Sequence, residues 1–499
     1  MSPGLSFRLM VVARFSLAGS LMQQHFIGGQ WVAAATGETL PVRDPSTGEV
    51  FDQLARGNAA DIDCAVVAAR QALGGPWGLL TATERGRILS KMGQIILSRA
   101  EELAQIEARD TGKPLTQARN DITVAARYCE FYGGAADKVH GHQIPYLNDF
   151  HVVVMHEPHG VTAHILPWNY PAQMFGRSVV PALAMGNAVV LKPSEDACLT
   201  PLMFCRIAQE AGLPDGALNV VTGLGEEAGA ALTAHPDINF VTFTGSPEVG
   251  RMVQKAAGER LIKCVLELGG KSPQIVFADA DLDRAEATIL KAITQNAGQT
   301  CSAGSRLLIQ ESILDNFMER VKKRFIASRA GSPSMDLDCG PLITAKQKER
   351  VEGFIRRAID SGVPLLAQGQ VADGVPAGGY YIAPTVFGPV PRGHELACDE
   401  VFGPVLSVIP FKDEADAVRL ANATDFGLLA GIWTRDGSRL TRMAKRMQCG
   451  QVYLNCYGAG GGVELPFGGV KHSGHGREKG FMSLEEFCVI KTVVQYHGE

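Results

Sequence analysis

The 499-residue sequence lacks any uninterrupted apolar run of about 18 residues, the length that a helix needs to cross a bilayer. It also lacks a concentrated basic segment, and its formal net charge is −5 at pH 7. Nucleic acids and anionic membrane surfaces are bound through clustered Lys and Arg side chains. We therefore expect neither a membrane nor a nucleic acid as a partner.

Patterned cysteine is absent too. The eleven cysteines include no Cys-x-x-Cys pair and no regular spacing. An odd number of scattered thiols in a large chain is typical of a reduced, cytoplasmic protein and argues against a disulfide framework. We expect most of these thiols to be small buried side chains, and we assign no metal ligand.

The N-terminal segment "MSPGLSFRLMVVARFSLAGSLM" has no acidic residue but carries Arg8 and Arg14. It can be interpreted as a signal or transit peptide. However, Arg14 interrupts its apolar part, and no clear small-residue cleavage site follows. We expect residues 1–21 to be a disordered extension and the folded part to begin at Met22.

The length and the 46% hydrophobic content predict two or more domains. Helical spacing of apolar residues dominates the first third, with helices expected over residues 59–73 and 84–112. From residue 161 short apolar runs such as "VTAHIL", "NAVVLK" and "INFVTF" alternate with helical stretches. This alternation predicts a parallel, doubly wound sheet, and a second region of the same kind begins near Leu268. The tail "CVIKTVVQY" is a strand that needs a sheet edge, on another subunit for example.

The segment "NAGQTCSAG" places Cys301 among small and polar residues. Cys301 is either a nucleophile or one more small residue in a tight turn. Sequence context alone leaves both interpretations open.

Glu267 in "LELGGKSP" stands between two leucines and precedes two glycines. A carboxylate in apolar surroundings is partly desolvated, which raises its pKa toward the range of a general base. The alternative is a glutamate that faces water at the end of a strand.

Asn169 in "PWNYP" lies between two prolines directly after an expected strand. A rigid turn fixes the side-chain amide, which can donate to an oxyanion. The alternative is a turn asparagine whose side chain bonds its own backbone.

Three further segments end strands at the edge where doubly wound sheets bind ligands. "LKPSE" places Lys192 and Glu195 there, where they can meet a ribose or phosphate, although such charges are more often solvated. "FTGSPEVG" places Gly245 and Ser246 at a helix start, which attracts phosphate or is simply a capped helix. "TGLGEEAGA", which contains Gly225, is a loose match to a dinucleotide fingerprint.

Taken together, "PWNYP", "LKPSE", "FTGS", "LELGGKSP", "NAGQTC", "EVFGP" and "PFGGVKHSGHGRE" closely resemble the NAD(P)-dependent aldehyde dehydrogenases of the hydrolytic type. The resemblance covers nearly the whole chain after Met22 and keeps the order of the family's motifs. It implies an α/β fold with two doubly wound, Rossmann-like domains and a small β oligomerisation element. The implied ranges are 22–138 and 160–267 for the NAD-binding domain, 268–477 for the catalytic domain, and 139–159 with 478–499 for the oligomerisation element.

The same resemblance assigns three catalytic residues. Cys301 matches the nucleophile that attacks the aldehyde carbonyl to give a thiohemiacetal and then a thioester. The Asn169 amide and the backbone N–H of Cys301 would hold the oxyanion. Glu267 matches the general base that activates water for hydrolysis.

The cofactor residues implied by the family surround an NAD molecule. A carboxylate at Glu195 would repel a 2′-phosphate, so NAD is favoured over NADP, although some relatives accept both. The matches are Lys192 and Glu195 for the adenosine ribose, Gly245 and Ser246 near the pyrophosphate, Glu400 for the nicotinamide ribose, Phe402 near the nicotinamide ring, and Trp168 beside the cleft. Gly225 is a further candidate for cofactor binding.

Two features of the sequence bear on substrate specificity. Arg177 matches an arginine that binds the carboxylate in relatives acting on succinic semialdehyde, but the second arginine of those enzymes is Gln295 here. Arg177 is equally interpreted as a helix-surface or interface charge. The glycine-rich run "CYGAGGGVELPFGG" predicts a wide entrance that Tyr170, Met174 and Tyr457 would face, so the aldehyde could be large or aromatic.

The family also implies a homodimer or homotetramer, with the hairpin near 140–159 and the tail strand as the subunit contact. Two rival functions stay open. A CoA-acylating relative would typically lack Glu267, and a catalytically silent relative would lose the nucleophile or the base.

Overall fold

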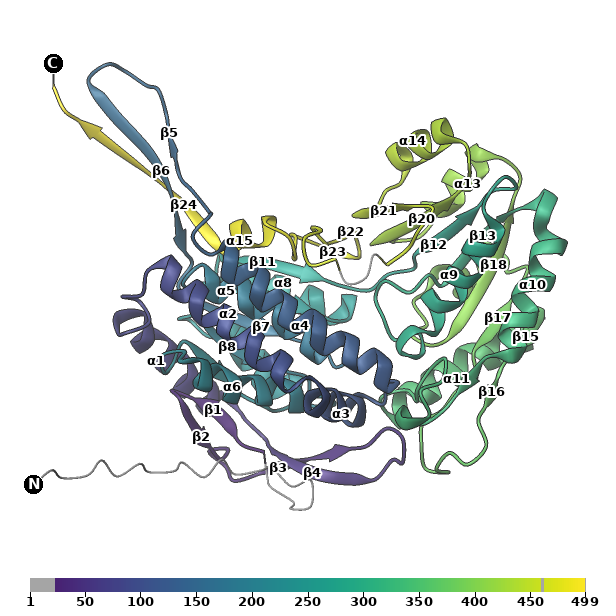
Figure 1. Cartoon of the computed structure of the whole chain (residues 1–499), viewed down its shortest axis with the longest axis horizontal. Coiled ribbons are helices and arrows are strands. Elements are labelled where there is room, and N and C mark those ends of the chain that lie inside the picture. Colours follow the sequence, from purple (N-terminus) through teal and green to yellow (C-terminus); the bar gives the residue numbers. More distant parts are fainter. Residues whose placement is uncertain (1–22, 459–461, 499) are drawn as a thin grey trace, which may run out of the picture.

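The computed structural model describes residues 23–458 and 462–498. Two α/β domains lie next to each other, and a narrow ribbon of strands projects from the first (Figure 1). The expected extension 1–21 and part of the glycine-rich run, residues 459–461, lie outside the described residues. Within the described ranges, no helix combines the length and the apolar character that crossing a bilayer requires.

The first domain is built on an eight-stranded sheet with a parallel centre and antiparallel edges. Its central strands are almost completely buried and mostly apolar, as expected for a sheet covered by helices on both faces. In spatial order the strands are β2 (Gln30–Val32), β1 (His25–Ile27), β9 (Leu218–Val220), β8 (Ala188–Lys192), β7 (Val161–Ile165), β10 (Phe240–Thr244), β11 (Lys263–Glu267) and β23 (Gly474–His475).

Helices cover this sheet, and α2 and α4 pack in an outer layer against α5 and α6 (Figure 1). The helices are α1 (Ala59–Gly74), α2 (Ala82–Ser98), α3 (Ala100–Thr111), α4 (Leu115–Ala135), α5 (Pro171–Ala184), α6 (Leu199–Ala211), the π-helix η1 (Gly225–Gly229), α7 (Ala230–Ala234) and α8 (Pro247–Glu259).

The helix predicted over residues 84–112 is two helices. Arg99 leaves helical geometry at φ −116° and ψ 20°, and it both ends α2 and precedes α3. The predicted end is confirmed, since Gly112 adopts a left-handed φ of 78° after α3. The prediction also missed the strands before α1, which include a separate hairpin of β3 (Thr39–Arg43) and β4 (Val50–Ala55).

The second domain is built on a seven-stranded sheet that is parallel except for its edge strand β15. The strands in order are β15 (Leu365–Gln368), β17 (Thr385–Phe387), β18 (Val405–Phe411), β13 (Arg306–Gln310), β12 (Pro273–Val276), β20 (Leu429–Trp433) and β21 (Gln451–Leu454). The helices are α9 (Leu282–Thr294), α10 (Leu314–Ala327), α11 (Ala345–Asp360), α12 (Glu395–Cys398), α13 (Glu414–Ala421) and α14 (Gly437–Arg446). Short 3-10 helices are η2 (Gln295–Gly298), η3 (Glu311–Ile313) and η4 (Pro333–Met335).

Two small sheets complete this part of the chain. They pair β14 (Arg329–Ala330) with β16 (Gln370–Val371), and β19 (Phe426–Gly427) with β22 (Val470–Lys471).

The projecting ribbon joins β5 (His142–Gln143), β6 (Phe150–Pro158) and the tail strand β24 (Cys488–Tyr496). The tail pairs antiparallel with β6 over its whole length, from Cys488 opposite Pro158 to Tyr496 opposite Phe150. The sheet edge that the tail needs therefore belongs to its own chain, and the other possibility, an edge on another subunit, does not apply to this pairing.

The chain returns to the first domain earlier than the predicted boundary at residue 477. Gly474 pairs with Glu267, which adds β23 to the edge of the first sheet. The following helix α15 (Met482–Glu486) brings Leu484 into the first core, together with Phe487. The predicted catalytic range 268–477 therefore includes one strand of the first domain, and part of 478–499 is core.

Candidate active site

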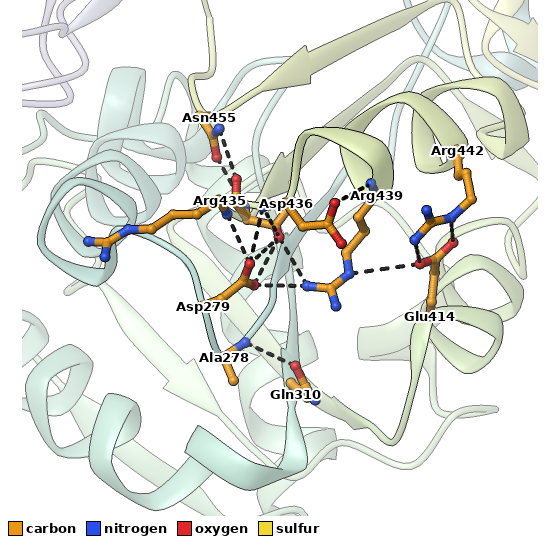
Figure 2. Close-up of polar contacts among 10 residues, drawn as sticks. Ala278, Asp279, Gln310, Glu414, Arg435, Asp436, Arg439, Arg442 and Asn455 are labelled. Atoms are coloured by element: carbon orange, nitrogen blue, oxygen red, sulfur yellow. Dashed lines mark hydrogen bonds and ion pairs between the residues drawn. The ribbon is translucent and has the colours of Figure 1, made fainter.

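A polar network lies at the carboxyl ends of β12, β13, β20 and β21 in the second sheet (Figure 2). Asp279, just after β12, accepts hydrogen bonds from the Thr434 hydroxyl, from the backbone N–H groups of Arg435 and Asp436, and from Arg439. The usual ligand edge of a parallel sheet is thus filled by the protein's own groups. The candidate site lies at the opposite end, where Cys301 precedes β13.

The loop before Cys301 has an uncommon backbone. Asn296, Ala297 and Gly298 all have left-handed φ values of 48°, 53° and 72°. A Cβ atom at Gly298 would lie 2.1 Å from the Gly403 carbonyl oxygen, so only glycine fits this turn. Non-glycine residues in this region are strained, and such strain is found at functional sites.

Cys301 is half-buried against an apolar cluster that includes Leu428, Phe467 and Tyr457. Burial raises the pKa of the Cys301 thiol to about 12, while Arg177 acts in the opposite direction. Glu267 and Glu400 also lie close enough to raise this pKa. The cysteine thus shares one electrostatic environment with both predicted carboxylates.

Glu267 is the last residue of β11, and it is only 1% exposed. Burial raises the pKa of its carboxyl group well above the usual range, against the opposing charge of Arg177. Neither carboxylate oxygen has a hydrogen-bond partner within the described residues, although Arg177 Nη2 lies 3.3 Å from Oε2. The predicted desolvation is confirmed, and the alternative of a water-facing glutamate is wrong.

Asn169 is buried, and its side-chain amide donates to the Gln299 carbonyl oxygen at 3.1 Å. The amide therefore lies beside the loop that leads to Cys301. The alternative, an asparagine bonded to its own backbone, is wrong because the acceptor is 130 residues away.

Arg177 on α5 is buried and pairs through Nε with the Glu478 carboxylate. Its guanidinium also lies 4.3 Å from the centre of the Phe467 ring. The helix-surface interpretation of Arg177 is therefore wrong. Its immediate carboxylate neighbours are Glu478 and Glu267 of the same chain.

The three residues proposed to line the substrate entrance are also located. The Tyr170 hydroxyl accepts a hydrogen bond from Gln295 Nε2 at 3.0 Å. The Tyr457 hydroxyl donates to the Ser302 carbonyl oxygen at 2.8 Å, next to Cys301. Met174 on α5 is buried in the first core.

On the predicted cofactor side, Lys192 is buried and donates to Glu195 at 2.5 Å. Glu400 accepts a hydrogen bond from the Gly270 N–H at 2.8 Å, and burial raises the pKa of its carboxyl group to about 7. A Cβ atom on Gly269 would lie 2.5 Å from Glu400 Oε2. The glycine pair thus packs between Glu400 and the cysteine loop.

Trp168 and Phe402 meet edge to face, with ring centres 5.4 Å apart, and Phe402 has a left-handed φ of 58°. An open cavity of about 780 Å³ lies here between the two domains. It is lined by Trp168 and Asp196 from the first domain and by Thr344, Gln347 and Arg350 at α11.

Beyond β10, Ser246 caps α8, because its hydroxyl accepts from the Val249 N–H at 3.3 Å. Gly245 directly precedes this cap, and the neighbouring Thr244 hydroxyl is buried without a hydrogen-bond partner in the described part of the chain. Gly225 begins the π-helix η1 after β9.

Three functional candidates escaped the sequence interpretation. Glu478 lies inside the quoted "HGRE" motif but received no role. Gln299 contributes its backbone carbonyl oxygen, which accepts from the Asn169 amide, so its residue type gave no indication of this contact. Lys113 follows Gly112 as an ordinary-looking charge, yet it is fully buried and donates to the Asn169 carbonyl oxygen.

Comparison with known proteins gives a consistent result. A family model described as "Aldehyde dehydrogenase family" matches residues 31–493. A mitochondrial benzaldehyde dehydrogenase from Antirrhinum majus is 43% identical over 472 residues, which is 94% of this chain and 88% of that protein.

Two solved structures are also similar. A crystal structure of a candidate aldehyde dehydrogenase from Burkholderia cenocepacia has a TM-score of 0.95 and 57% identity, covering 95% of this chain and 100% of that one. A betaine aldehyde dehydrogenase from Staphylococcus aureus in complex with NAD+ has a TM-score of 0.94 and 33% identity, covering 97% and 96%. The chain therefore belongs to the aldehyde dehydrogenase family of oxidoreductases.

Proposed function

We propose that the protein oxidises an aldehyde to a carboxylic acid with NAD, through a thioester on Cys301. The observation that carries this proposal is the convergence of three distant segments. The Asn169 amide reaches the carbonyl two residues before Cys301, and Glu267 shares the electrostatic environment of the sulfur.

The residues present fit a dinucleotide. Lys192 and Glu195 lie at the carboxyl end of β8 and suit a ribose, and Glu400 suits a second ribose. The Thr244 hydroxyl, which has no hydrogen-bond partner among residues 23–458 and 462–498, and the N-terminus of α8 suit a pyrophosphate. When bound, NAD supplies the acceptor for the hydride that leaves the aldehyde carbon. Because Glu195 would repel a 2′-phosphate, NAD is favoured over NADP.

The first task of the protein is nucleophilic attack. The Cys301 thiol gives its proton to solvent, and its sulfur bonds to the carbonyl carbon of the aldehyde. Arg177 and Lys479 oppose the effect of burial and favour the thiolate. The Asn169 amide and the backbone N–H of Cys301 donate to the oxyanion of the thiohemiacetal.

The second task is hydrolysis. Glu267 accepts a proton from water, the hydroxide adds to the thioester carbonyl, and the carbon–sulfur bond breaks to release the acid. The raised pKa of Glu267 makes its carboxylate a stronger base than a solvated glutamate, which suits a general base.

The rival substrate class, a semialdehyde acid bound by Arg177, is less well supported. Arg177 already contacts the carboxylates of Glu478 and Glu267, and Gln295 bonds Tyr170. Cys301 packs among Leu428, Phe467 and Tyr457. We therefore favour an uncharged aldehyde.

Transfer of the acyl group to CoA is the rival chemistry. The presence of Glu267, whose charge acts on the Cys301 thiol, favours hydrolysis. Acyl-CoA without free acid, in a reaction supplied with CoA, would overturn the hydrolytic proposal.

We also propose a homodimer or homotetramer. Ile490, Val494 and Tyr496 on the projecting β24 are 70%, 54% and 64% exposed, an apolar face that a second copy would cover. Light scattering of wild type and of Val494→Asp tests this; a monomeric wild type would refute it.

A cytoplasmic location is proposed from the eleven free thiols. Cell fractionation tests this location, because the similar plant protein carries a mitochondrial name.

The proposed chemistry is tested by NADH absorbance with uncharged, aromatic and carboxylated aldehydes. Cys301→Ala should abolish NADH formation, and equal rates would defeat the role of Cys301. Glu267→Gln should retain a first-turnover burst but lose about a hundredfold or more in steady-state rate.

A further inference from the structure

We infer that Lys113 is a positioning residue that holds the Asn169 backbone, and thereby orients the Asn169 amide toward the oxyanion. The inference rests on the proposed role of Asn169 and adds a residue to the site. Lys113 lies between α3 and α4, far from Asn169 in the sequence and outside the motifs that carry the resemblance to the family.

The Lys113 ammonium group has three donors, and each has an acceptor. Nζ lies 2.5 Å from Asp121 Oδ2, 3.1 Å from Glu107 Oε1 and 3.1 Å from the Asn169 carbonyl oxygen. The side chain is completely buried, and Nζ also lies 4.5 Å from the centre of the Tyr170 ring. The ammonium therefore has one fixed position, set by groups on both sides of it.

Burying a lysine is costly unless carboxylates compensate it. Glu107 and Asp121 are buried on α3 and α4, and Gln173 Nε2 donates to Asp121 at 2.6 Å. These acids keep Lys113 charged. A charge-assisted bond to the Asn169 carbonyl is stronger than a neutral one, which explains why a cation is used here.

The other lone pair of the same carbonyl accepts from Asn296 Nδ2 at 2.9 Å. Asn296 belongs to the strained loop before Cys301, so Asn169 is held between the first domain and the cysteine loop. Its own amide then donates to Gln299 O. Lys113 is thus the anchor from the first domain for the residue that would stabilise the oxyanion.

Removal of Lys113 alone would leave two buried carboxylates without a cation, so folding has to be protected. The test therefore compares Lys113→Met/Asp121→Asn with Asp121→Asn alone. The single variant keeps the lysine and its bonds to Glu107 and Asn169. Thermal unfolding and NAD titration check that both variants are folded and bind cofactor, because Glu107 stays buried without a cation in the double variant.

The expected result is a kcat about tenfold to a hundredfold lower in the double variant than in Asp121→Asn, since small misplacements of catalytic groups can cost this much. The rate of iodoacetamide labelling of Cys301 should stay unchanged, because alkylation needs no oxyanion donor. Lys113→Gln/Asp121→Asn keeps a donor for the Asn169 carbonyl and should recover part of kcat.

The decisive comparison repeats the substitutions in an Asn169→Ala background. If Lys113 acts through Asn169, they should change kcat less than about twofold there, because coupled residues are not additive. An equal loss in both backgrounds, or a normal kcat without Lys113, would overturn the inference while leaving the proposed function standing. An unchanged kcat in Asn169→Ala alone would overturn the oxyanion proposal and this inference with it.

Discussion

The guanidinium of Arg177 lies 3.3 Å from the carboxylate of Glu267, and both side chains are buried. The positive charge stabilises the ionised form of Glu267, while burial and the nearby Glu478 favour the protonated form. The pKa of the proposed general base is therefore set by opposing neighbours. Changing either neighbour should move the pH profile in a known direction.

Arg177→Gln should shift the rising limb of the kcat profile to higher pH by about one unit or more. Hydrolysis needs the carboxylate form, and loss of the cation raises the Glu267 pKa further, so activity at neutral pH falls. The measurement is steady-state NADH formation from about pH 5 to about pH 10, the range in which such groups titrate.

Two controls separate this role from carboxylate binding. Arg177→Lys keeps the charge and should shift the profile less, and Glu478→Gln should shift it to lower pH, because Glu478 raises the Glu267 pKa. If Arg177→Gln harmed only carboxylated aldehydes and left the pH profile in place, Arg177 would be a substrate ligand instead.

Alkylation of Cys301 in the protein without cofactor should be slow at neutral pH and rise about tenfold per pH unit. Burial raises the pKa of this thiol to about 12, so the thiolate fraction grows throughout the accessible range. Iodoacetamide labelling followed by peptide mass spectrometry measures the rate, with exposed Cys64 as an internal reference. A plateau near pH 8 would contradict the prediction.

Gly269→Ala should weaken NAD binding about tenfold or more without unfolding the protein. The new Cβ would lie 2.5 Å from Glu400 Oε2 and would displace this carboxylate, the proposed ribose ligand. A contact this short forces a neighbour to move. Gly258→Ala, where the Cβ meets no atom within 4 Å, is the matched control and should leave the NAD dissociation constant unchanged. Equal affinities of the two variants for NAD would remove Glu400 from the cofactor site.

Asp279→Ala should destabilise the second domain by about 1–3 kcal/mol but leave kcat unchanged. The substitution removes the shared acceptor of Thr434, Arg435, Asp436 and Arg439 (Figure 2). Because this network closes the end of the sheet opposite to Cys301, the chemistry should not change. Thermal unfolding and NADH formation are the two measurements, and a large loss of kcat in the folded variant would show that both ends of the sheet are coupled.

The parts of the molecule that the sequence predicted well are those encoded locally. Strands such as β10 and β13 are short segments rich in apolar residues, and the stop at Gly112 is a short-range signal. Desolvation of Glu267 followed from its flanking leucines. The resemblance to a family then located Cys301 and Asn169, which spacing alone could not have singled out.

What the sequence could not predict depends on contacts between distant segments. From the sequence alone, Arg177 cannot be distinguished from a surface charge, because its partner Glu478 is 301 residues away. The break at Arg99 lies inside a continuous apolar pattern. The pairing of β24 with β6 and the return of Gly474 to β11 are long-range register choices that no local pattern specifies.

The hydrogen bond from the Asn169 amide to Gln299 crosses between the two domains, and its donor and acceptor are 130 residues apart. Neither half of the molecule expressed by itself could then contain a working reaction centre. Hybrid enzymes assembled from two relatives would have to inherit the 107–121 and 169 segments together with the matching 296–301 loop. A junction placed near residue 268 would divide this unit even when both halves fold correctly.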